Sequence, residues 1–476
     1  MTDPVPLIHG ARLDQEAVEP EHGRPHELID PATGAAWATL TYGGEPEARR
    51  AVDSAAAALT PWAQVSGPGR AAVLRAVAAE LRTEAVIDEF ARLITRETGK
   101  RIAEARGEVG LSATFFEWFA DTVSGRASQV WSHVPGLRHE VSSRALGVVA
   151  VLTPWNFPAS IPARKIAPAL AAGCTVVFKP SEVAPASGLY LAEIIDRHVP
   201  RGTVSTVVGE PAAISDIWLA DRRVRGLTFT GSTRVGRILA AATAPRFTRS
   251  VLELGGNAPF VVLDDADLDD AVEVLMVAKY RNNGQSCIAA NQVWAPARLA
   301  DDLADRFRRS SEKLVIGDPT DESTTLGPLA LASDPERIGV LIDSAGGDTW
   351  RTDVALPPAG HFIRPAVSVR PARDSALVTE EIFGPAVSVL GYDSLDEVLE
   401  SVADGPYGLG GYVVGPQQRA TEVARKLDVG IVGVNTGSPN TPQVPFAGLK
   451  DSGLGVEGSH LGLEAFLAPQ TVAVGQ

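Results

Sequence analysis

Apolar residues recur at helical spacing over much of the first quarter of the chain. Between residues 46 and 122, alanine, valine, leucine and isoleucine repeat every three or four positions, which is typical of amphipathic helices. The clearest helical stretches are residues 51–59, 70–81 and 85–97. Gly99 gives the last of them a natural end. Residues 1–45 hold short apolar runs between prolines and glycines instead, and we expect strands and turns there that pack on another part of the protein.

From residue 145 the pattern changes to short runs that are apolar throughout, separated by helical segments. The expected strands are 146–152, 175–178, 204–208, 226–229 and 250–254, and the expected helices are 162–172, 187–197 and 234–242. Strands without polar alternation indicate a parallel sheet that is covered on both faces. Because the connections are short, we predict an α/β fold with a doubly wound, Rossmann-like domain.

A second α/β block follows a pair of glycines at positions 255 and 256. Its expected strands are 260–263, 292–295, 386–392, 411–414 and 430–435, and its expected helices are 267–279 and 301–313. Residues 345–375 are rich in proline and glycine, so we expect them to loop over the surface. Outside both blocks, residues 129–141 predict a hairpin, and residues 464–474 predict a helix end followed by a strand.

Length and composition narrow the class of protein. With 476 residues the chain is long enough for two or three domains, and 43 basic against 58 acidic residues give a net charge of −15. Such a charge disfavours binding to nucleic acid or to an anionic membrane. No apolar run is long enough to span a membrane and the N-terminus lacks a signal-peptide pattern, so we expect a cytoplasmic protein. Two cysteines far apart exclude a disulfide framework.

Cys287 is the first candidate for chemistry. It ends a polar, glycine-containing segment (residues 281–287) between two apolar blocks, where a thiolate would have access and local dipoles. An ordinary buried thiol is the alternative, and it is the better interpretation of Cys174, which stands in an apolar run. The histidines nearest to Cys287 in sequence are His198 and His361, so nothing supports a Cys–His pair, and we expect no metal site.

Glu253 ends an apolar strand directly before the two glycines. Either it is a surface residue or it is a functional acid or base whose pKa is raised by burial, and the glycines favour the second interpretation. Residues 229–236 join a strand end to a helix start, which suits a pyrophosphate as well as an ordinary helix cap. Residues 453–458 fit G-x-G-x-x-G, but no strand precedes them and too little chain follows for a βαβ unit, so we expect a tight turn.

Seven segments, in order along the chain, resemble motifs of the aldehyde dehydrogenase superfamily. They are residues 153–158, 179–182, 229–236, 253–256, 284–287, 381–385 and 445–450. The resemblance runs from about residue 25 to the C-terminus, and it implies NAD(P)-dependent oxidation of an aldehyde to a carboxylic acid.

The same resemblance implies a role for each catalytic candidate. Cys287 would be the nucleophile that forms a thiohemiacetal and then a thioester. Asn156 and the backbone N–H of Cys287 would form the oxyanion hole, and Glu253 would activate the hydrolytic water. Lys165 and Glu457 match positions credited with proton relay or with keeping the site intact. No histidine or metal is required.

A dinucleotide site is implied as well. Its residues are Trp155, Lys179, Ser181, Glu182, Gly231, Ser232, Glu381 and Phe383. The residues at 179 and 182 match those that hold the adenosine ribose, the serine at 232 matches the pyrophosphate contact, and the residues at 381 and 383 match contacts to the nicotinamide half. Since a carboxylate at position 182 accepts from both ribose hydroxyls and repels a 2′-phosphate, we favour NAD, with NADP as the alternative.

On the substrate side the chain is similar to the succinate-semialdehyde dehydrogenase branch. Arg164 and Arg281 match the carboxylate-binding arginines of that branch, and two guanidinium groups suit a small-molecule aldehyde with a second, anionic end. The alternative is that each arginine is structural or paired with a nearby acid. Asn440 replaces a serine that contacts the carboxylate, and an asparagine still donates. Further departures from the branch are Ala447, Gln292 and Val456.

The implied organisation has three parts. Residues 1–123 and 146–253 would form the dinucleotide-binding domain, residues 254–445 the catalytic domain, and residues 124–145 with 460–476 a small β element that builds homodimers or homotetramers. Succinate semialdehyde is the best guess for the substrate. The rival interpretations are a dehydrogenase for another small aliphatic or betaine-type aldehyde, a CoA-acylating relative, and a non-catalytic structural homologue, which the intact nucleophile, base and oxyanion residues oppose.

Overall fold

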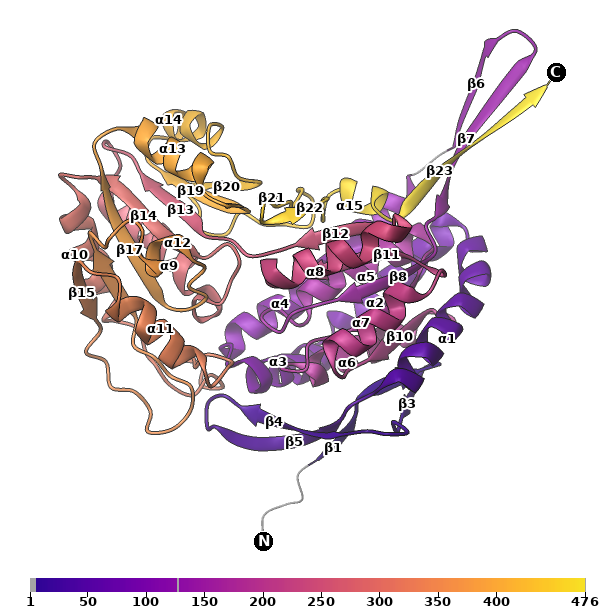
Figure 1. The fold of residues 1–476 in the computed structure, drawn as a ribbon, viewed down its shortest axis with the longest axis horizontal. Coiled ribbons are helices and arrows are strands. Elements are labelled where there is room, and N and C mark those ends of the chain that lie inside the picture. Colours follow the sequence, from indigo (N-terminus) through magenta and orange to yellow (C-terminus); the bar gives the residue numbers. More distant parts are fainter. Residues whose placement is uncertain (1–5, 126–127, 476) are drawn as a thin grey trace.

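The structure of the protein is a computed structural model that describes residues 6–125 and 128–475. The chain folds into two lobes and a projecting arm (Figure 1). The N-terminal lobe is built on an eight-stranded sheet and the second lobe on a seven-stranded sheet, and helices pack on both, which confirms the predicted α/β class. The parts of the predicted ranges at residues 1–5, 126–127 and 476 lie outside the described residues.

Parallel strands form the centre of the N-terminal sheet. The strand order is β22-β12-β11-β8-β9-β10-β2-β3, with antiparallel pairs at both edges. The bounds are β2 Ala11–Leu13, β3 Glu16–Val18, β8 Val148–Leu152, β9 Thr175–Lys179, β10 Val204–Val207, β11 Val224–Thr230, β12 Arg249–Glu253 and β22 Gly453–Leu454. Every residue of β8 is buried because helices cover both faces of the sheet.

Alternate side chains of these strands enter two separate cores. Val149 and Val151 pack with α2 to α6 on one face, whereas Val148 and Ala150 pack with α1, α7 and α8 on the other. The helices are α1 Glu45–Gln64, α2 Gly67–Leu81, α3 Glu84–Thr98, α4 Ile102–Ser124, α5 Ser160–Ala172, α6 Pro185–Asp196, α7 Pro211–Ala220 and α8 Thr233–Thr243, with a 3-10 turn at Ala244–Arg246. Gly99 ends α3 in the left-handed conformation (φ 72°), as its position predicted.

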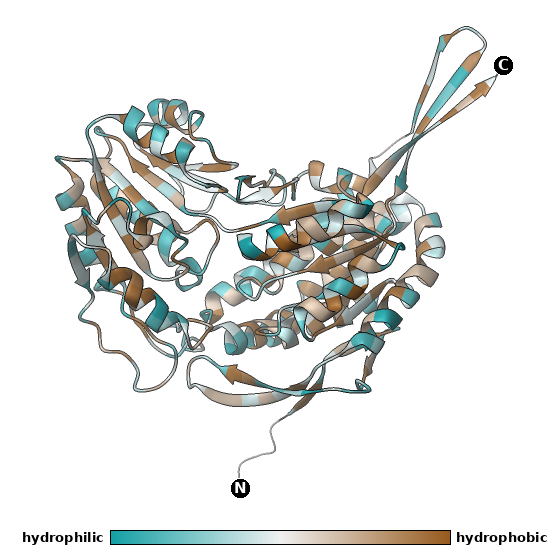
Figure 2. Cartoon of the chain, in the orientation of Figure 1, coloured by the Kyte–Doolittle hydropathy of each residue, from teal (hydrophilic) through white to brown (hydrophobic). Residues whose placement is uncertain are grey.

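The second lobe repeats this layering on a sheet of order β15-β16-β17-β14-β13-β19-β20. Its strands are β13 Ala258–Val262, β14 Ala290–Pro296, β15 Asp348–Arg351, β16 Ala366–Val369, β17 Ala386–Tyr392, β19 Gly410–Val414 and β20 Ile431–Val434. Its helices are α9 Leu268–Tyr280, α10 Ala300–Ser311, α11 Asp334–Asp343, α12 Ala376–Thr379, α13 Leu395–Asp404 and α14 Gln417–Ala424, with a 3-10 turn at Arg281–Gly284. The central strands of both lobes are mostly hydrophobic (Figure 2).

The prediction that residues 345–375 only loop over the surface was wrong. β15 and β16 lie within this range and extend the second sheet at its edge. β15 has four residues and is largely exposed, so it lacks the apolar run by which the other strands were recognised. The turn expected at residues 453–458 likewise begins with the two-residue strand β22, which pairs with the end of β12.

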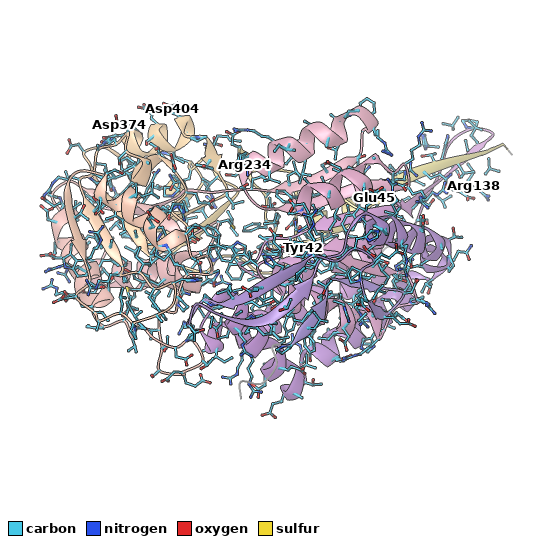
Figure 3. The ribbon with its side chains drawn as sticks, turned by 60° about the horizontal axis from the view of Figure 1, so that its bottom comes forward. Tyr42, Glu45, Arg138, Arg234, Asp374 and Asp404 are labelled. Carbon is cyan, nitrogen blue, oxygen red and sulfur yellow. The ribbon has the colours of Figure 1, made fainter. Side chains whose placement is uncertain are left out.

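The arm consists of β6 (Gln129–Val134), β7 (Leu137–Ala145) and β23 (Leu467–Gly475). β6 and β7 form the predicted hairpin, and β23 pairs antiparallel with the whole of β7. The helix end predicted before this last strand is α15 (Leu461–Glu464). The arm projects from the N-terminal lobe in Figure 1, and Arg138 labels it in Figure 3.

Smaller elements complete the described chain. β1 (Leu7–His9), β4 (Pro25–Asp30) and β5 (Ala35–Thr41) form a three-stranded sheet beside the first lobe, which confirms the strands predicted within residues 1–45. β18 (Tyr407–Gly408) pairs with β21 (Leu449–Lys450). Within residues 6–125 and 128–475, every helix is too short or too polar to cross a membrane.

Candidate active site

Strand ends of the first lobe bring several predicted residues to one edge of its sheet. β8 leads into the loop that carries Asn156, β11 leads into Gly231 and Ser232, and β12 ends at Glu253. The carboxyl ends of parallel strands share one edge, and open α/β sheets bind their ligands there. The loop that carries Cys287 approaches this edge from the second lobe.

The segment that leads to Cys287 has an unusual backbone. Asn282, Asn283 and Gly284 follow one another at φ 51°, 58° and 79°, in the left-handed region that asparagine and glycine tolerate best. The Asn283 side chain fixes this shape, because its Nδ2 donates to two backbone carbonyls (3.1 and 2.9 Å) and its Oδ1 accepts from a backbone amide (2.8 Å). A Cβ at position 284 would lie 2.3 Å from Gly384 O, so only glycine fits.

One pocket collects the predicted nucleophile, base and substrate-binding side chains. Cys287 is half-buried and lines this pocket together with Glu253, Arg164, Arg281 and Asn440. The rest of the wall is mainly apolar and consists of Leu111, Phe157, Ser160, Ile161, Thr230, Ser286, Ile288 and Phe446. The pocket therefore joins residues of α4, α5, β11 and β12 to loops that lie beyond β13 in the chain.

The Cys287 thiol is neutral near pH 7 in this environment. Burial, with the nearby carboxylates of Glu381 and Glu253, raises the pKa of this thiol to about 12, and the positive charge of Arg164 opposes the rise. A thiolate is the reactive form, so attack on a carbonyl needs a base that takes the thiol proton. Cys174 is the buried thiol that the sequence predicted, fully shielded from solvent in the core of the first lobe.

Glu253 is a buried carboxyl group rather than a surface residue. It is 2% exposed, and neither carboxylate oxygen has a hydrogen-bond partner among the described residues. Burial and the negative charge of Glu457 raise the pKa of Glu253 well above its ordinary value, while Lys165 and Arg164 lower it. A buried carboxylate with free lone pairs beside a nucleophile is suited to act as a general base.

Lys165 and Glu457 form a buried ion pair beside this base. The Lys165 ammonium contacts Glu457 Oε1 and also donates to Thr228 Oγ1 (3.0 Å). Burial lowers the pKa of Lys165, whereas the negative charges of Glu457 and Glu253 raise it. No group of three or more histidine, cysteine or acidic residues in the described part of the chain is placed to hold a metal ion.

Asn156 is 3% exposed and its amide already makes one contact. Its Nδ2 donates to Gln285 O at 3.1 Å, in the loop just before Cys287. An amide nitrogen carries two hydrogens, so the second N–H stays free for a ligand oxygen. The backbone carbonyl of Asn156 accepts from Asn282 Nδ2 (2.9 Å) and Lys100 Nζ (2.8 Å), and the first of these bonds ties Asn156 to the segment that leads to Cys287.

The residues predicted for the adenosine ribose lie together at the end of β9. Lys179 Nζ is 3.0 Å from Glu182 Oε2, and the lysine is buried while the carboxylate is partly exposed. Ser181 Oγ accepts from the backbone of Val183 (3.2 Å), which shapes the turn between them. Ser232 caps α8 by accepting from Val235 N at 3.4 Å, so the ordinary capping role predicted as its alternative is present.

A second cluster predicted for the cofactor lies between the lobes. Gly256 N donates to Glu381 Oε1 (3.2 Å), and a Cβ at Gly255 would lie 2.9 Å from the other carboxylate oxygen. Burial raises the pKa of Glu381 to about 7. The rings of Trp155 and Phe383 meet edge to face with their centroids 5.5 Å apart.

These features fit a dinucleotide along the strand edge. Thr153 Oγ1 and Thr230 Oγ1, at the ends of β8 and β11, are buried without a hydrogen-bond partner among the described residues. Gly231 and Gly255 keep the strand edge free of side chains, and the start of α8 offers free N–H groups. The unpaired hydroxyls and the glycine-lined edge are what a phosphate-bearing ligand needs.

The two predicted substrate arginines point at the pocket from different elements. Arg164, on α5, lies over the Phe446 ring (4.5 Å) and has its Nη1 3.9 Å from Glu457 Oε2. Arg281 lies over the Phe157 ring (5.2 Å) and donates to Ser438 Oγ at 3.3 Å. Arg164 therefore has an acidic partner, Glu457, as the structural alternative expected, but at a long distance.

Four charged residues near the site were not predicted from the sequence. They are Glu97, Lys100, Glu104 and Glu108. Charged residues on helices are ordinarily solvated, so nothing in the sequence pattern distinguishes these from surface residues. The sequence around them (residues 96–108) is rich in charged residues throughout, so no signal in it could have found these four.

Known relatives cover nearly the whole chain. Residues 18–472 match the model of the aldehyde dehydrogenase family. A glutarate-semialdehyde dehydrogenase of Pseudomonas putida is 39% identical over 464 residues and covers 96% of each chain. An NADP-dependent succinate-semialdehyde dehydrogenase of Escherichia coli is 37% identical, covering 98% of this chain and 97% of that protein. These similarities confirm the resemblance to the semialdehyde dehydrogenase branch.

Solved structures show the same fold. The succinate-semialdehyde dehydrogenase of Burkholderia pseudomallei has a TM-score of 0.94 at 38% identity and covers all of both chains. A betaine aldehyde dehydrogenase of Staphylococcus aureus in complex with NAD+ also has a TM-score of 0.94, at 29% identity over 98% of this chain and 94% of that one. Sequence and fold agree over nearly the full length, so the chain belongs to the aldehyde dehydrogenase family, whose members oxidise aldehydes with NAD(P).

Proposed function

We propose that the chain oxidises a short aldehyde with a second, anionic end to the corresponding dicarboxylic acid, with succinate semialdehyde as the first candidate substrate. The observation that carries this proposal is the single pocket that Cys287 and Glu253 share with Arg164 and Arg281. Guanidinium groups pair with carboxylates through two parallel hydrogen bonds, so the arginines suit the far end of such a substrate. Relatives named for succinate and glutarate semialdehydes support the same class.

The reaction begins with attack by the sulfur of Cys287 on the aldehyde carbon. As the carbon–sulfur bond forms, the thiol proton passes to Glu253, which lies in the same pocket with both oxygens unpaired among the described residues. The aldehyde oxygen takes up negative charge, and the free N–H of Asn156 and the backbone N–H of Cys287 donate to it. One such donor is worth about 3–4 kcal/mol to the transition state in comparable sites.

NAD(P), when bound, would supply the hydride acceptor at this point, and loss of hydride from the tetrahedral carbon would leave a thioester on Cys287. Glu253 first releases the thiol proton, which is the one proton set free in each turnover, and then removes a proton from a water molecule as that water attacks the thioester carbon. The carbon–sulfur bond breaks, the acid leaves, and the sulfur recovers a proton. Each turnover consumes aldehyde, water and oxidised cofactor, and it yields acid, reduced cofactor and one proton.

Lys165 and Glu457 would carry that proton away from Glu253. Both are buried, they contact one another, and both act on the pKa of Glu253. Glu457 raises the pKa of Glu253 while Lys165 lowers it, so the two residues act in opposite directions on how readily Glu253 gives up its proton.

For the cofactor, we propose NAD over NADP. The Glu182 carboxylate can accept from both hydroxyls of the adenosine ribose and would repel a phosphate on the 2′ oxygen. A second carboxylate, Glu210, lies close enough for both acids to raise the pKa of Tyr42, although burial is the larger cause of a pKa of about 12 there. This end of the strand edge therefore carries negative charge around Lys179, which is already paired with Glu182.

We also propose that the arm joins copies of the chain into homodimers or homotetramers. The dinucleotide-binding and catalytic domains keep, in this proposal, the bounds that the sequence predicted. Val130 and Trp131 on the arm are 61% and 51% exposed, which is unusual for large apolar side chains next to each other. The edge of β6 is unpaired in the described chain, and an unpaired edge strand favours pairing with another chain.

The charge at the far end of the aldehyde distinguishes the rival substrate classes. A betaine-type aldehyde carries a cation, which Arg164 and Arg281 would repel, and a simple aliphatic aldehyde would leave both guanidinium groups unpaired. A CoA-acylating enzyme has no need of a water-activating base, so Glu253 favours hydrolysis.

An initial-rate comparison of succinate semialdehyde, glutarate semialdehyde, betaine aldehyde and propanal, each with NAD and with NADP, tests these points. We expect the highest kcat/KM for a semialdehyde with NAD. Arg281→Gln should raise the KM for the semialdehyde by about tenfold or more while changing that for propanal little, because only the semialdehyde loses a charge-assisted hydrogen bond. Equal effects on both aldehydes would contradict the carboxylate role, and full activity of Cys287→Ala would contradict the chemistry itself.

A further inference from the structure

A buried ion pair lies at the junction of α3 and α4, outside the groups that take part in the proposed chemistry. Lys100 is 1% exposed and Glu108 is 4% exposed, and the Lys100 ammonium contacts Glu108 Oε2. Burying two charges is costly unless their remaining hydrogen bonds are satisfied, so the partners of such a pair show what it holds in place.

The Lys100 ammonium makes a second contact, with Asn156, the residue proposed for the oxyanion hole. Its Nζ donates to the backbone carbonyl of Asn156 at 2.8 Å. The same ammonium lies 4.0 Å from the centre of the Phe157 ring, and Arg281 lies over that ring too, at 5.2 Å. One lysine therefore contacts the peptide that carries Asn156 and the aromatic ring on which the substrate arginine rests.

The other carboxylate oxygen of Glu108 contacts residues that follow Asn156 in the chain. Its Oε1 accepts from the backbone amides of Ala159 and Ser160, at 2.9 and 3.0 Å. These amides belong to the first turn of α5, where a carboxylate satisfies otherwise unpaired N–H groups and interacts favourably with the helix dipole. α5 carries Arg164 and Lys165, so the carboxylate fixes the start of the helix that supplies both.

Asn156 is thus held from both ends of a short segment. Lys100 holds its carbonyl, Glu108 holds the backbone three and four residues later, and the ion pair links the two contacts. Asn282 donates to the same carbonyl from the nucleophile loop. We propose that Lys100 and Glu108 are a positioning pair that sets the orientation of Asn156 towards the bound aldehyde oxygen, and so the rate at which Cys287 is acylated.

This role rests on the proposed function and adds residues that touch neither substrate nor cofactor. A donor stabilises a developing oxyanion only from the correct place, and a displacement of about 1 Å lowers a rate by about 10²-fold. Loss of the pair should therefore lower the rate of acylation, while the KM for NAD stays near its original value because the residues at the end of β9 are not touched.

The test is the pre-steady-state burst of reduced cofactor, expressed per reactive Cys287, in the full-length enzyme. The variants are Lys100→Met, Glu108→Gln and the combination of both. The matched control is Arg12→Met, which breaks the partly buried pair between Arg12 and Asp196 (2.7 Å) near the far edge of the first sheet. Hydrolysis of a p-nitrophenyl ester is measured as well, because it needs the same nucleophile and oxyanion donors but no hydride transfer.

We expect the burst rate and the ester hydrolysis of Lys100→Met to fall about 10²-fold, with an unchanged KM for NAD, and the control to keep its burst rate. The double variant should be little worse than the poorer single variant, because both remove one coupled unit. If Lys100→Met does not fold, the same fall in the burst rate and ester hydrolysis of Glu108→Gln would support the positioning role. Unchanged burst rates in the folded variants, or an equal fall in Arg12→Met, would overturn the positioning role while leaving aldehyde oxidation in place.

Discussion

Arg164 lies between the substrate pocket and the buried charges around Glu253. Its Nη1 is 3.9 Å from Glu457 Oε2, and its Nε has no hydrogen-bond partner in the described residues. Its positive charge lowers the pKa of Glu253 and of Cys287, while burial raises both. A substrate carboxylate bound to Arg164 would offset that charge, so binding of the far end of the substrate and ionisation of the catalytic groups are linked.

Replacement of Arg164 by glutamine removes a charge that favours the ionised form of Glu253. Because the base works when it is deprotonated, a higher pKa moves the acidic limb of the kcat profile to higher pH. We expect Arg164→Gln to lose activity at neutral pH and to recover part of it under alkaline conditions. Propanal is the substrate for this measurement, since it makes no use of the arginine for binding. A shift towards lower pH, or an equal shift in Arg281→Gln, would contradict the link.

Among single residues, the sequence singled out the site candidates whose neighbours along the chain form a distinctive pattern. Cys287 stood out because its segment is polar between apolar blocks, and Glu253 because it ends an apolar strand. Lys100 and Glu108 did not, because the sequence pattern of a charged residue between or on helices is the same whether its side chain faces water or a buried partner. Their burial depends on α4 and α5 packing together, which is a property of the tertiary structure.

A buried carboxylate also binds the first backbone amides of helix α6, as Glu108 does for α5. Glu97, near the end of α3, is 1% exposed and accepts from the amides of Ala186 and Ser187, at 2.7 and 2.9 Å. Burial raises the pKa of Glu97 to about 7, although these hydrogen bonds act in the opposite direction. α6 follows directly on the segment with Lys179 and Glu182, so α3 supports the segment proposed to bind the cofactor, as α4 supports the segment after Asn156.

The raised pKa of Glu97 makes stability fall as the pH rises. Between its unfolded value of 4.5 and about 7, the unfolded state releases a proton that the folded state keeps. Over that window the group removes about 3 kcal/mol of unfolding free energy. We expect Glu97→Gln to flatten the decline of Tm between pH 5 and pH 8, measured by thermal unfolding followed by circular dichroism. A steeper decline in the variant would show that the carboxylate is ionised in the folded state throughout.

Elements with a continuous apolar pattern were predicted close to their observed bounds, β17 at residues 386–392 among them. The helices α7, α11, α13 and α14, the edge strand β15 and its neighbour β16 were not predicted. Most of these lie on the outside of a sheet or at its edge, where one face meets water and the apolar signal is short. The strand β22 is set by its pairing with β12 rather than by its own two residues.

On the scale of the whole molecule, the arm is the part whose surface is not explained by a single copy of the chain. Val130, Trp131 and Val472 are exposed on its strands, and the arm extends away from both lobes (Figure 1). A strand that pairs with nothing on one edge and carries exposed apolar residues is stabilised when a second chain covers it.

We therefore expect the combined substitution Val130→Asp and Trp131→Asp to reduce the native mass from that of a dimer or tetramer to that of a smaller species, measured by light scattering after size-exclusion chromatography. Val340→Asp is the control, because Val340 is 62% exposed but lies on α11, away from the arm. An unchanged native mass in the double variant would place the subunit contact elsewhere.

The most direct test of the proposed chemistry follows the sulfur of Cys287 itself. In Glu253→Gln the nucleophile and oxyanion donors remain, but the group that takes the thiol proton and activates water is gone. Acylation and hydride transfer therefore slow, and the thioester that does form persists because no group activates its water. After mixing with succinate semialdehyde and NAD, mass spectrometry of the quenched variant should show an acyl group, in thioester linkage, on the peptide that contains Cys287. An unmodified Cys287 in a variant that has formed one equivalent of reduced cofactor, or an acyl group on another residue, would contradict the assignment of this cysteine as the nucleophile.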